Sequence, residues 1–151
     1  MIVNRPRLRK RLRSRRGQTA VETAIILSVL FTLVLGIYEY GRLVMIKQLM
    51  GNASREGARQ AVVNTSTMTT AQIQTTVTGF LAGQSYNNLA IQVYQADPTT
   101  GNNIGVWTGA PFGSTIAVQV DLYYAPITPV SWGLPGALHM TSKSLMRSEA
   151  N

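Results

Sequence analysis

Residues 15–40 read RRGQTAVETAIILSVLFTLVLGIYEY, and this stretch decides the fold of the chain. Its apolar part, Ala20 to Tyr38, is 19 residues long and contains one charged side chain, Glu22. A helix of that length rises by roughly 28 Å, which is about the thickness of the hydrocarbon core of a bilayer. The sequence therefore predicts a transmembrane helix over about residues 20–38.

Glu22 is the feature of this helix that needs an explanation. On insertion scales a carboxylate at the centre of a membrane helix costs about 2.5 to 3.5 kcal/mol, and the cost falls toward the helix end, where Glu22 lies. One interpretation is that the carboxylate is kept for a charged partner. The other is that Gly17 only links a basic anchor to the helix and that the Glu22 side chain reaches back to the interface.

Positive charge is concentrated in the N-terminal segment. Eight of the 14 basic residues and none of the six acids lie in residues 1–16, so the charges cancel from Gly17 onward. By the positive-inside rule, residues 1–17 are predicted to be a basic cytoplasmic leader, and the rest of the chain crosses the membrane. No aromatic side chain alternates with these arginines to stack on bases, so a nucleic-acid partner is not predicted.

A single long helix is predicted over residues 18–63, because no proline occurs between Pro6 and Pro98. Beyond Tyr38 its apolar residues recur every three or four positions, which is the pattern of an amphipathic helix. Small residues, which let another backbone approach closely, recur every four positions in this half: Ala53, Gly57 and Ala61. This stripe is interpreted either as packing against the chain's own C-terminal sheet or as a helix–helix contact with another subunit.

Residues 64–151 are predicted to form a small α+β domain. A second helix is expected over Thr70 to Leu81, with Thr70 as its N-cap and Gly83 as its stop. Alternating apolar residues predict about three antiparallel strands, at Leu89–Gln95, Ser114–Tyr124 and Ala137–Arg147. Residues 97–113, rich in Gly, Asn, Thr and Pro, are predicted to be a loop. One face of the sheet must be covered, and the outer half of the long helix is the available cover.

Catalysis has little support in the sequence. Because the chain has no cysteine and His139 is its only histidine, His/Cys metal clusters and Cys/His dyads are excluded. The acids of the C-terminal half are scattered, so neither an enzyme, a cofactor nor a small-molecule substrate is predicted.

An alternative class is a single-pass membrane-anchored extracytoplasmic binding module that uses the loop aromatics Trp107, Phe112 and Trp132. The simpler interpretation of these rings is that they anchor loops to the core.

Three stretches carry a resemblance to a known family: RRGQTAVE at 15–22, LGIYEYGRL at 35–43 and NASREGARQAV at 52–62. On these motifs the chain resembles the TadE-like proteins, minor pseudopilins of the tight-adherence (Flp, type IVb) pilus system. The resemblance implies a pilin-like fold and a leader cut after Gly17 by a prepilin peptidase. Gln18 would then be the first mature residue, and Glu22 would pair with the N-terminal amine of a neighbouring subunit during assembly.

The resemblance also implies a location and a set of partners. Thr23 follows Glu22 where the major pilins typically have tyrosine, and a folded domain follows the helix, so a minor subunit is expected. Its expected partners are the membrane, other pilin or pseudopilin subunits, the peptidase and the pilus or secretion machinery. It would be a single-pass protein of the inner (cytoplasmic) membrane, with its C-terminal domain periplasmic or extracellular.

Overall fold

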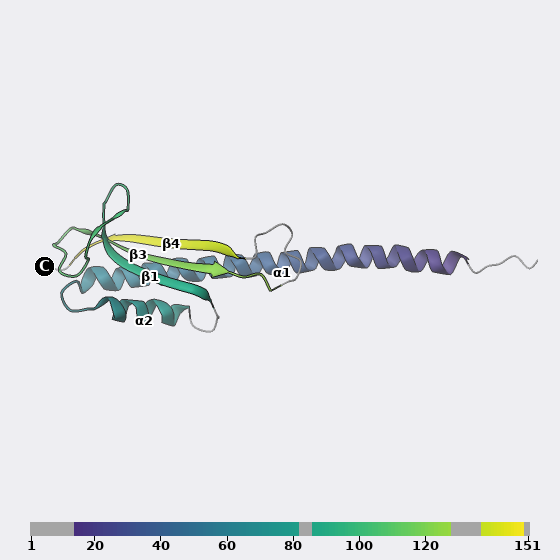
Figure 1. Cartoon of the computed structure of the whole chain (residues 1–151), viewed down its shortest axis with the longest axis horizontal. Coiled ribbons are helices and arrows are strands. Elements are labelled where there is room, and N and C mark those ends of the chain that lie inside the picture. The colour runs from purple at the N-terminus through teal and green to yellow at the C-terminus, as the bar shows by residue number, and fades with distance from the viewer. Residues whose placement is uncertain (1–13, 82–85, 128–136, 150–151) are drawn as a thin grey trace, which may run out of the picture. The chain divides into compact units, whose positions relative to one another are not determined.

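The computed structural model describes residues 14–81, 86–127 and 137–149. These residues divide into two compact units, one that ends at Tyr38 and one that begins at Glu39. Figure 1 shows the elements of each unit along the chain. The fold class is α+β, as predicted, with a long helix, a short helix and an antiparallel sheet.

The long helix, α1, runs from Ser14 to Val63 (Figure 1). In the first unit the large apolar side chains between Val21 and Tyr38 are exposed. Among the described residues, α1 is the one helix that is long and apolar enough to cross a membrane. An exposed apolar surface of this size fits a single-pass membrane anchor.

The second helix, α2, covers Thr70 to Phe80, so it lies within the predicted range and ends one residue before Leu81. Its N-cap is Thr69, whose extended backbone and side chain form a capping box with Gln72. The Thr69 amide donates to Gln72 Oε1 at 2.8 Å, and Thr69 Oγ1 accepts from the Gln72 amide at 3.4 Å. The prediction of Thr70 as the cap was wrong because a capping box requires Gln three residues after the cap. The expected stop, Gly83, lies outside the described residues.

The sheet has four strands instead of about three, in the order β2-β1-β3-β4, and all described pairings are antiparallel. The strands are β1 (Asn87–Ala96), β2 (Asn103–Gly105), β3 (Thr115–Tyr124) and β4 (Leu138–Arg147).

The unpredicted strand, β2, lies inside the expected loop and, among the described strands, pairs with the end of β1. A tight turn makes this pairing possible, since the Asp97 carboxylate accepts from the amides of Thr99 and Thr100 at 2.7 and 2.8 Å. These two bonds hold the pKa of Asp97 below its usual value.

The core of the second unit lies between one face of the sheet and the two helices. The five residues predicted to share the inner face of β3 are all buried: Ile116, Val118, Val120, Leu122 and Tyr124. From α1, the side chains of Ile46 and Met50 are buried in the same cluster, and α2 adds Ile73 and Val77. The outer half of α1 is therefore the cover that the sheet requires.

The stripe of small residues lies where α2 and β3 approach α1. Ala53 and Ala61 are fully buried. A Cβ atom added to Gly57 would lie 2.6 Å from Val77 Cγ2 and 3.3 Å from Val118 Cγ1. Val77 of α2 and Val118 of β3 thus occupy the space beside Gly57. At this position the stripe packs within its own chain, and not against another subunit.

Candidate functional site

The two predicted processing residues, Gly17 and Gln18, and the predicted assembly residue, Glu22, lie in the first turns of α1, and all three are exposed. Gln18 Nε2 donates a hydrogen bond to Glu22 Oε1 at 3.1 Å, so the two side chains meet across one helical turn. The carboxylate therefore already has a donor from its own chain. A new N-terminus at Gln18 would place a charged backbone amine one helical turn before Glu22, in addition to this side-chain contact.

Two of the other polar side chains of the apolar segment, Thr23 and Ser28, form hydrogen bonds within the helix. The hydroxyl of Thr23 donates to the carbonyl of Thr19 at 2.9 Å, and that of Ser28 donates to the carbonyl of Ala24 at 2.8 Å. Hydroxyls bonded to the preceding turn enter lipid at little cost, because they leave no donor unpaired. Glu22 remains as the side chain of this segment that carries a charge.

Gly17 is helical in the intact chain, since α1 begins three residues before it. A peptidase that cuts after Gly17 must first unwind this turn. Glycine weakens a helix by about 0.5 to 1 kcal/mol relative to alanine, so Gly17 lowers the cost of opening this turn. The predicted cleavage position is thus compatible with a helical precursor.

A second cluster, which sequence reasoning missed, lies at the start of the second unit. The Tyr124 hydroxyl, at the end of β3, donates to Glu39 Oε1 on α1. The same oxygen accepts from the Ile127 amide at 3.4 Å and lies 3.5 Å from Arg42 Nη1. The Arg42 guanidinium also lies 5.1 Å from the centre of the Tyr124 ring. The cluster joins the end of the sheet to α1 directly after the apolar segment.

Burial and the Glu39 carboxylate raise the pKa of Tyr124 to about 12. Between pH 10 and 12 the Tyr124 hydroxyl therefore keeps its proton in the folded protein and loses it in the unfolded chain. Because of this difference, the free energy of unfolding falls as the pH rises through this range. We expect a loss of up to about 1.4 kcal/mol per pH unit from this one group. The measurement is denaturant unfolding of the full chain in detergent, at pH 8 to 12.

The matched variant for this prediction is Tyr124→Phe. At pH 8 it should be less stable than the natural chain by about 1 to 3 kcal/mol, because it loses the hydrogen bond to a charged acceptor. Above pH 10 the difference should shrink. A difference that stays constant up to pH 12 would show that Tyr124 titrates normally in the folded chain.

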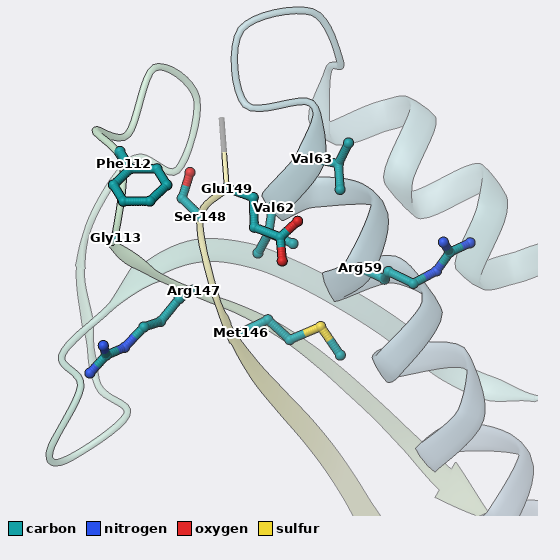
Figure 2. Close-up of a pocket in the computed structure, with 9 residues that line it drawn as sticks. All are labelled: Arg59, Val62, Val63, Phe112, Gly113, Met146, Arg147, Ser148 and Glu149. Carbon is teal, nitrogen blue, oxygen red and sulfur yellow. The ribbon is translucent and has the colours of Figure 1, made fainter. Parts of the chain in front are cut away.

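A cavity of about 470 Å³ lies at the other end of the second unit, at the C-terminal end of α1 (Figure 2). It is formed by three segments that are distant in sequence. Its lining residues are Arg59, Val62 and Val63 from α1, Phe112 and Gly113 from the loop, and Met146, Arg147, Ser148 and Glu149 from the C-terminal segment. The Glu149 amide donates to the Val62 carbonyl at 3.0 Å and thereby holds the C-terminal segment against the helix.

The loop aromatics have different environments. Trp107 is buried, and its Nε1 donates to Thr70 Oγ1 at 2.9 Å, so this ring anchors the loop to α2. The Phe112 side chain is 70% exposed at the rim of the cavity (Figure 2). Trp132 lies outside the described residues. Of the two aromatics that the structure describes, Phe112 is the one available for a contact with another molecule.

The charged side chains around the cavity are only partly paired. Arg59 makes a two-pronged contact with Glu56, at 3.0 and 2.7 Å, which lowers the pKa of the Glu56 carboxyl. Figure 2 shows the Arg59 and Arg147 side chains on opposite sides of the cavity. The Ser148 hydroxyl is buried and has no hydrogen-bond partner in the part of the chain that the structure describes.

His139 lies on the outer face of the sheet. Its Nε2 is 3.6 Å from Asp121 Oδ1, and its ring centre is 4.9 Å from that of Tyr123. The Asp121 carboxylate also accepts from Thr141 Oγ1 at 2.6 Å and from Gln119 Nε2 at 2.8 Å. Over residues 14–81, 86–127 and 137–149, no group of three or more His, Cys, Asp or Glu side chains could hold a metal ion.

The fold and the exposed apolar segment define a class of protein, an α+β domain carried by a single helix of membrane-spanning length. Most of that helix matches a known family model. Residues 17–59 match the model of the TadE family, described as TadE-like protein, which confirms the resemblance stated above over that range. No curated protein and no solved structure matches the chain. The match associates the chain with a structural, pilus-associated family.

Proposed function

We propose that this chain is a minor pseudopilin that takes part in assembly of an Flp-type pilus or a related secretion apparatus. The observation that carries the proposal is the position of the family match, which begins at Gly17 and includes Glu22 within the apolar helix. A peptidase cut after Gly17 would remove all eight leader charges and create one new cation, the amine of Gln18.

The new amine gives Glu22 a reason to be in the apolar segment. Two opposite charges about 4 Å apart attract each other by about 4 kcal/mol at an effective dielectric constant of 20. That attraction is comparable to the cost of placing a carboxylate in the membrane, about 2.5 to 3.5 kcal/mol at the centre. Pairing with the amine of an adjacent subunit would also fix the register between two helices. The role of the protein is then structural, through helix packing.

The same proposal sets the location and partners. The leader stays in the cytoplasm, residues 20–38 cross the inner membrane, and the domain from residue 64 onward is periplasmic or extracellular. The partners are other pilin or pseudopilin subunits, the prepilin peptidase and the pilus or secretion machinery. The role does not require a cofactor, because it depends on contacts between helices.

Cleavage after Gly17 is the test of this proposal. When the full chain is expressed with its cognate prepilin peptidase, we expect it to lose residues 1–17, which is visible as a mobility shift on a gel. Gly17→Val should retain these residues, since a branched side chain would replace the glycine at the cut. A matched control, Gly36→Val, lies in the same helix with open space around it and should be cut normally.

A second candidate function is the single-pass anchored binding module. The exposed Phe112 ring beside the cavity of about 470 Å³ favours it, because an exposed aromatic at a cavity is typical of a recognition surface. The experiment above separates the two functions. A binding module that is merely anchored needs no processing, so the intact chain with residues 1–17 attached in the presence of the peptidase would favour it.

A further inference from the structure

One face of α1 in the second unit is not covered by the described parts of the domain. Six residues at helical spacing line a groove of about 470 Å³ there: Val44, Lys47, Gln48, Gly51, Asn52 and Arg55. We call this surface the Gly51 groove. Residues of the same segment on another face, Ile46, Met50 and Ala53, are buried in the core. Over the described residues, the groove is therefore a face of α1 different from the one that packs in the core.

Gly51 leaves the middle of this face open. A Cβ atom added at position 51 would meet no other atom within 4 Å, in contrast to the crowded position of Gly57. Glycine in the middle of a helix costs about 0.5 to 1 kcal/mol relative to alanine. The described contacts of the domain do not explain a glycine here, whereas close approach of another helix would explain it.

The groove carries two positive charges that have no internal partner. Within the described residues, neither Lys47 nor Arg55 forms an ion pair, whereas Arg42 and Arg59 on the same helix pair with Glu39 and Glu56. Lys47 and Arg55 are eight residues apart, which corresponds to about 12 Å along the helix axis, with Gly51 midway. No acidic residue lines the groove.

We propose that the Gly51 groove receives a helix of a different pilin-like subunit, one that presents an acidic side chain between Lys47 and Arg55. This proposal rests on the proposed function and names the surface that meets the partner. A second copy of this chain that docked groove to groove would be a poor occupant, because the two sets of Lys47 and Arg55 would bring like charges together, and such juxtaposition costs several kcal/mol. The groove thus selects a non-identical neighbour.

Two variants of the full chain test the proposal, Gly51→Leu and the double variant Lys47→Glu/Arg55→Glu. The readout is co-purification of pilin subunits from the native host in detergent. We expect at least a tenfold loss of recovered partner in both cases, with an unchanged melting temperature. The matched control is Gly79→Leu on α2, because Gly79 also has open space around it. Recovery with the control should equal that of the natural chain.

A photocrosslinker identifies the occupant. Because the chain has no cysteine, Gln48→Cys provides a single attachment point for a benzophenone maleimide. We expect a crosslink to a different chain that has an apolar N-terminal helix, at a position within one turn of an acidic residue. Replacing that acid by lysine should restore assembly with the Lys47→Glu/Arg55→Glu variant.

Two outcomes would overturn the inference. One is a crosslink mainly to a second copy of the chain. The other is normal partner recovery with Gly51→Leu, under conditions in which a change at Glu22 still reduces it. In the second case the groove is not the contact surface while the proposed function stands. If neither the groove variants nor the Glu22 variant reduces partner recovery, the result counts against both the groove and the proposed function.

Discussion

Replacing Gly57 by leucine is expected to unfold the second unit, and Gly57→Ala should lower its stability by about 1 to 3 kcal/mol. The reason is overpacking, since an added Cβ would lie 2.6 Å from Val77 Cγ2 and 3.3 Å from Val118 Cγ1. Val77 and Val118 are fully buried, so neither side chain has free space to move into. For a domain of this size the alanine variant should melt roughly 4 to 15 °C lower than the natural chain. Thermal unfolding of the full chain in detergent, followed by circular dichroism, measures this.

Gly51→Ala is the matched control for this prediction. Its position lies on the same helix, but an added Cβ meets no atom within 4 Å. Alanine favours the helix over glycine by about 0.5 to 1 kcal/mol, so the variant should be as stable as the natural chain or slightly more stable. Equal melting temperatures for Gly57→Ala and Gly51→Ala would contradict the close packing of α1 against α2 and β3.

Glu22→Ala is expected to reduce co-purification of partner pilin subunits at least tenfold while membrane insertion is retained. Removing the carboxylate lowers the cost of insertion, so the protein should remain in the membrane fraction. Assembly should suffer because the attraction of about 4 kcal/mol to a terminal amine is lost, and about 1.4 kcal/mol already corresponds to a factor of ten. Glu22→Gln should behave similarly, since it keeps the shape of the side chain and removes the charge.

Ser28→Ala controls for a general effect of changing a polar residue in the apolar segment. Its hydroxyl bonds only to the carbonyl of the preceding turn in the described contacts, at 2.8 Å, so partner recovery should not change. If Glu22→Ala recovers partners as well as Ser28→Ala does, the carboxylate has no role in assembly. Loss of the protein from the membrane fraction would show that Glu22 acts in insertion instead.

Local patterns predicted the elements of the fold well. The absence of proline and the apolar run predicted α1, and the strict alternation from Ile116 to Tyr124 predicted the buried face of β3. The N-cap of α2 was misplaced by one residue, because Thr69 and Thr70 are adjacent and have the same intrinsic capping propensity. Only the partner Gln72 distinguishes Thr69 from Thr70. β2 was missed because its three residues pair in a turn-rich segment, where no alternation can be read.

The candidate sites differ in how far the sequence could predict them. Gln18 and Glu22 are four residues apart and Gly17 directly precedes Gln18, so their proximity follows from helix geometry. The Tyr124–Glu39 hydrogen bond joins residues 85 positions apart, and the cavity beside Phe112 combines three distant segments. Such contacts depend on the tertiary arrangement, and periodicity carries no signal for them.

The central claim is that a newly created amine on Gln18 accompanies Glu22 in the membrane. Mass spectrometry of the N-terminal peptide of the protein isolated from its native host tests this claim most directly. The account predicts that the mature chain begins at Gln18, with residues 1–17 absent. Recovery of the arginine-rich peptide still joined to Gln18 in the assembled protein would contradict it, because the amine would then never form.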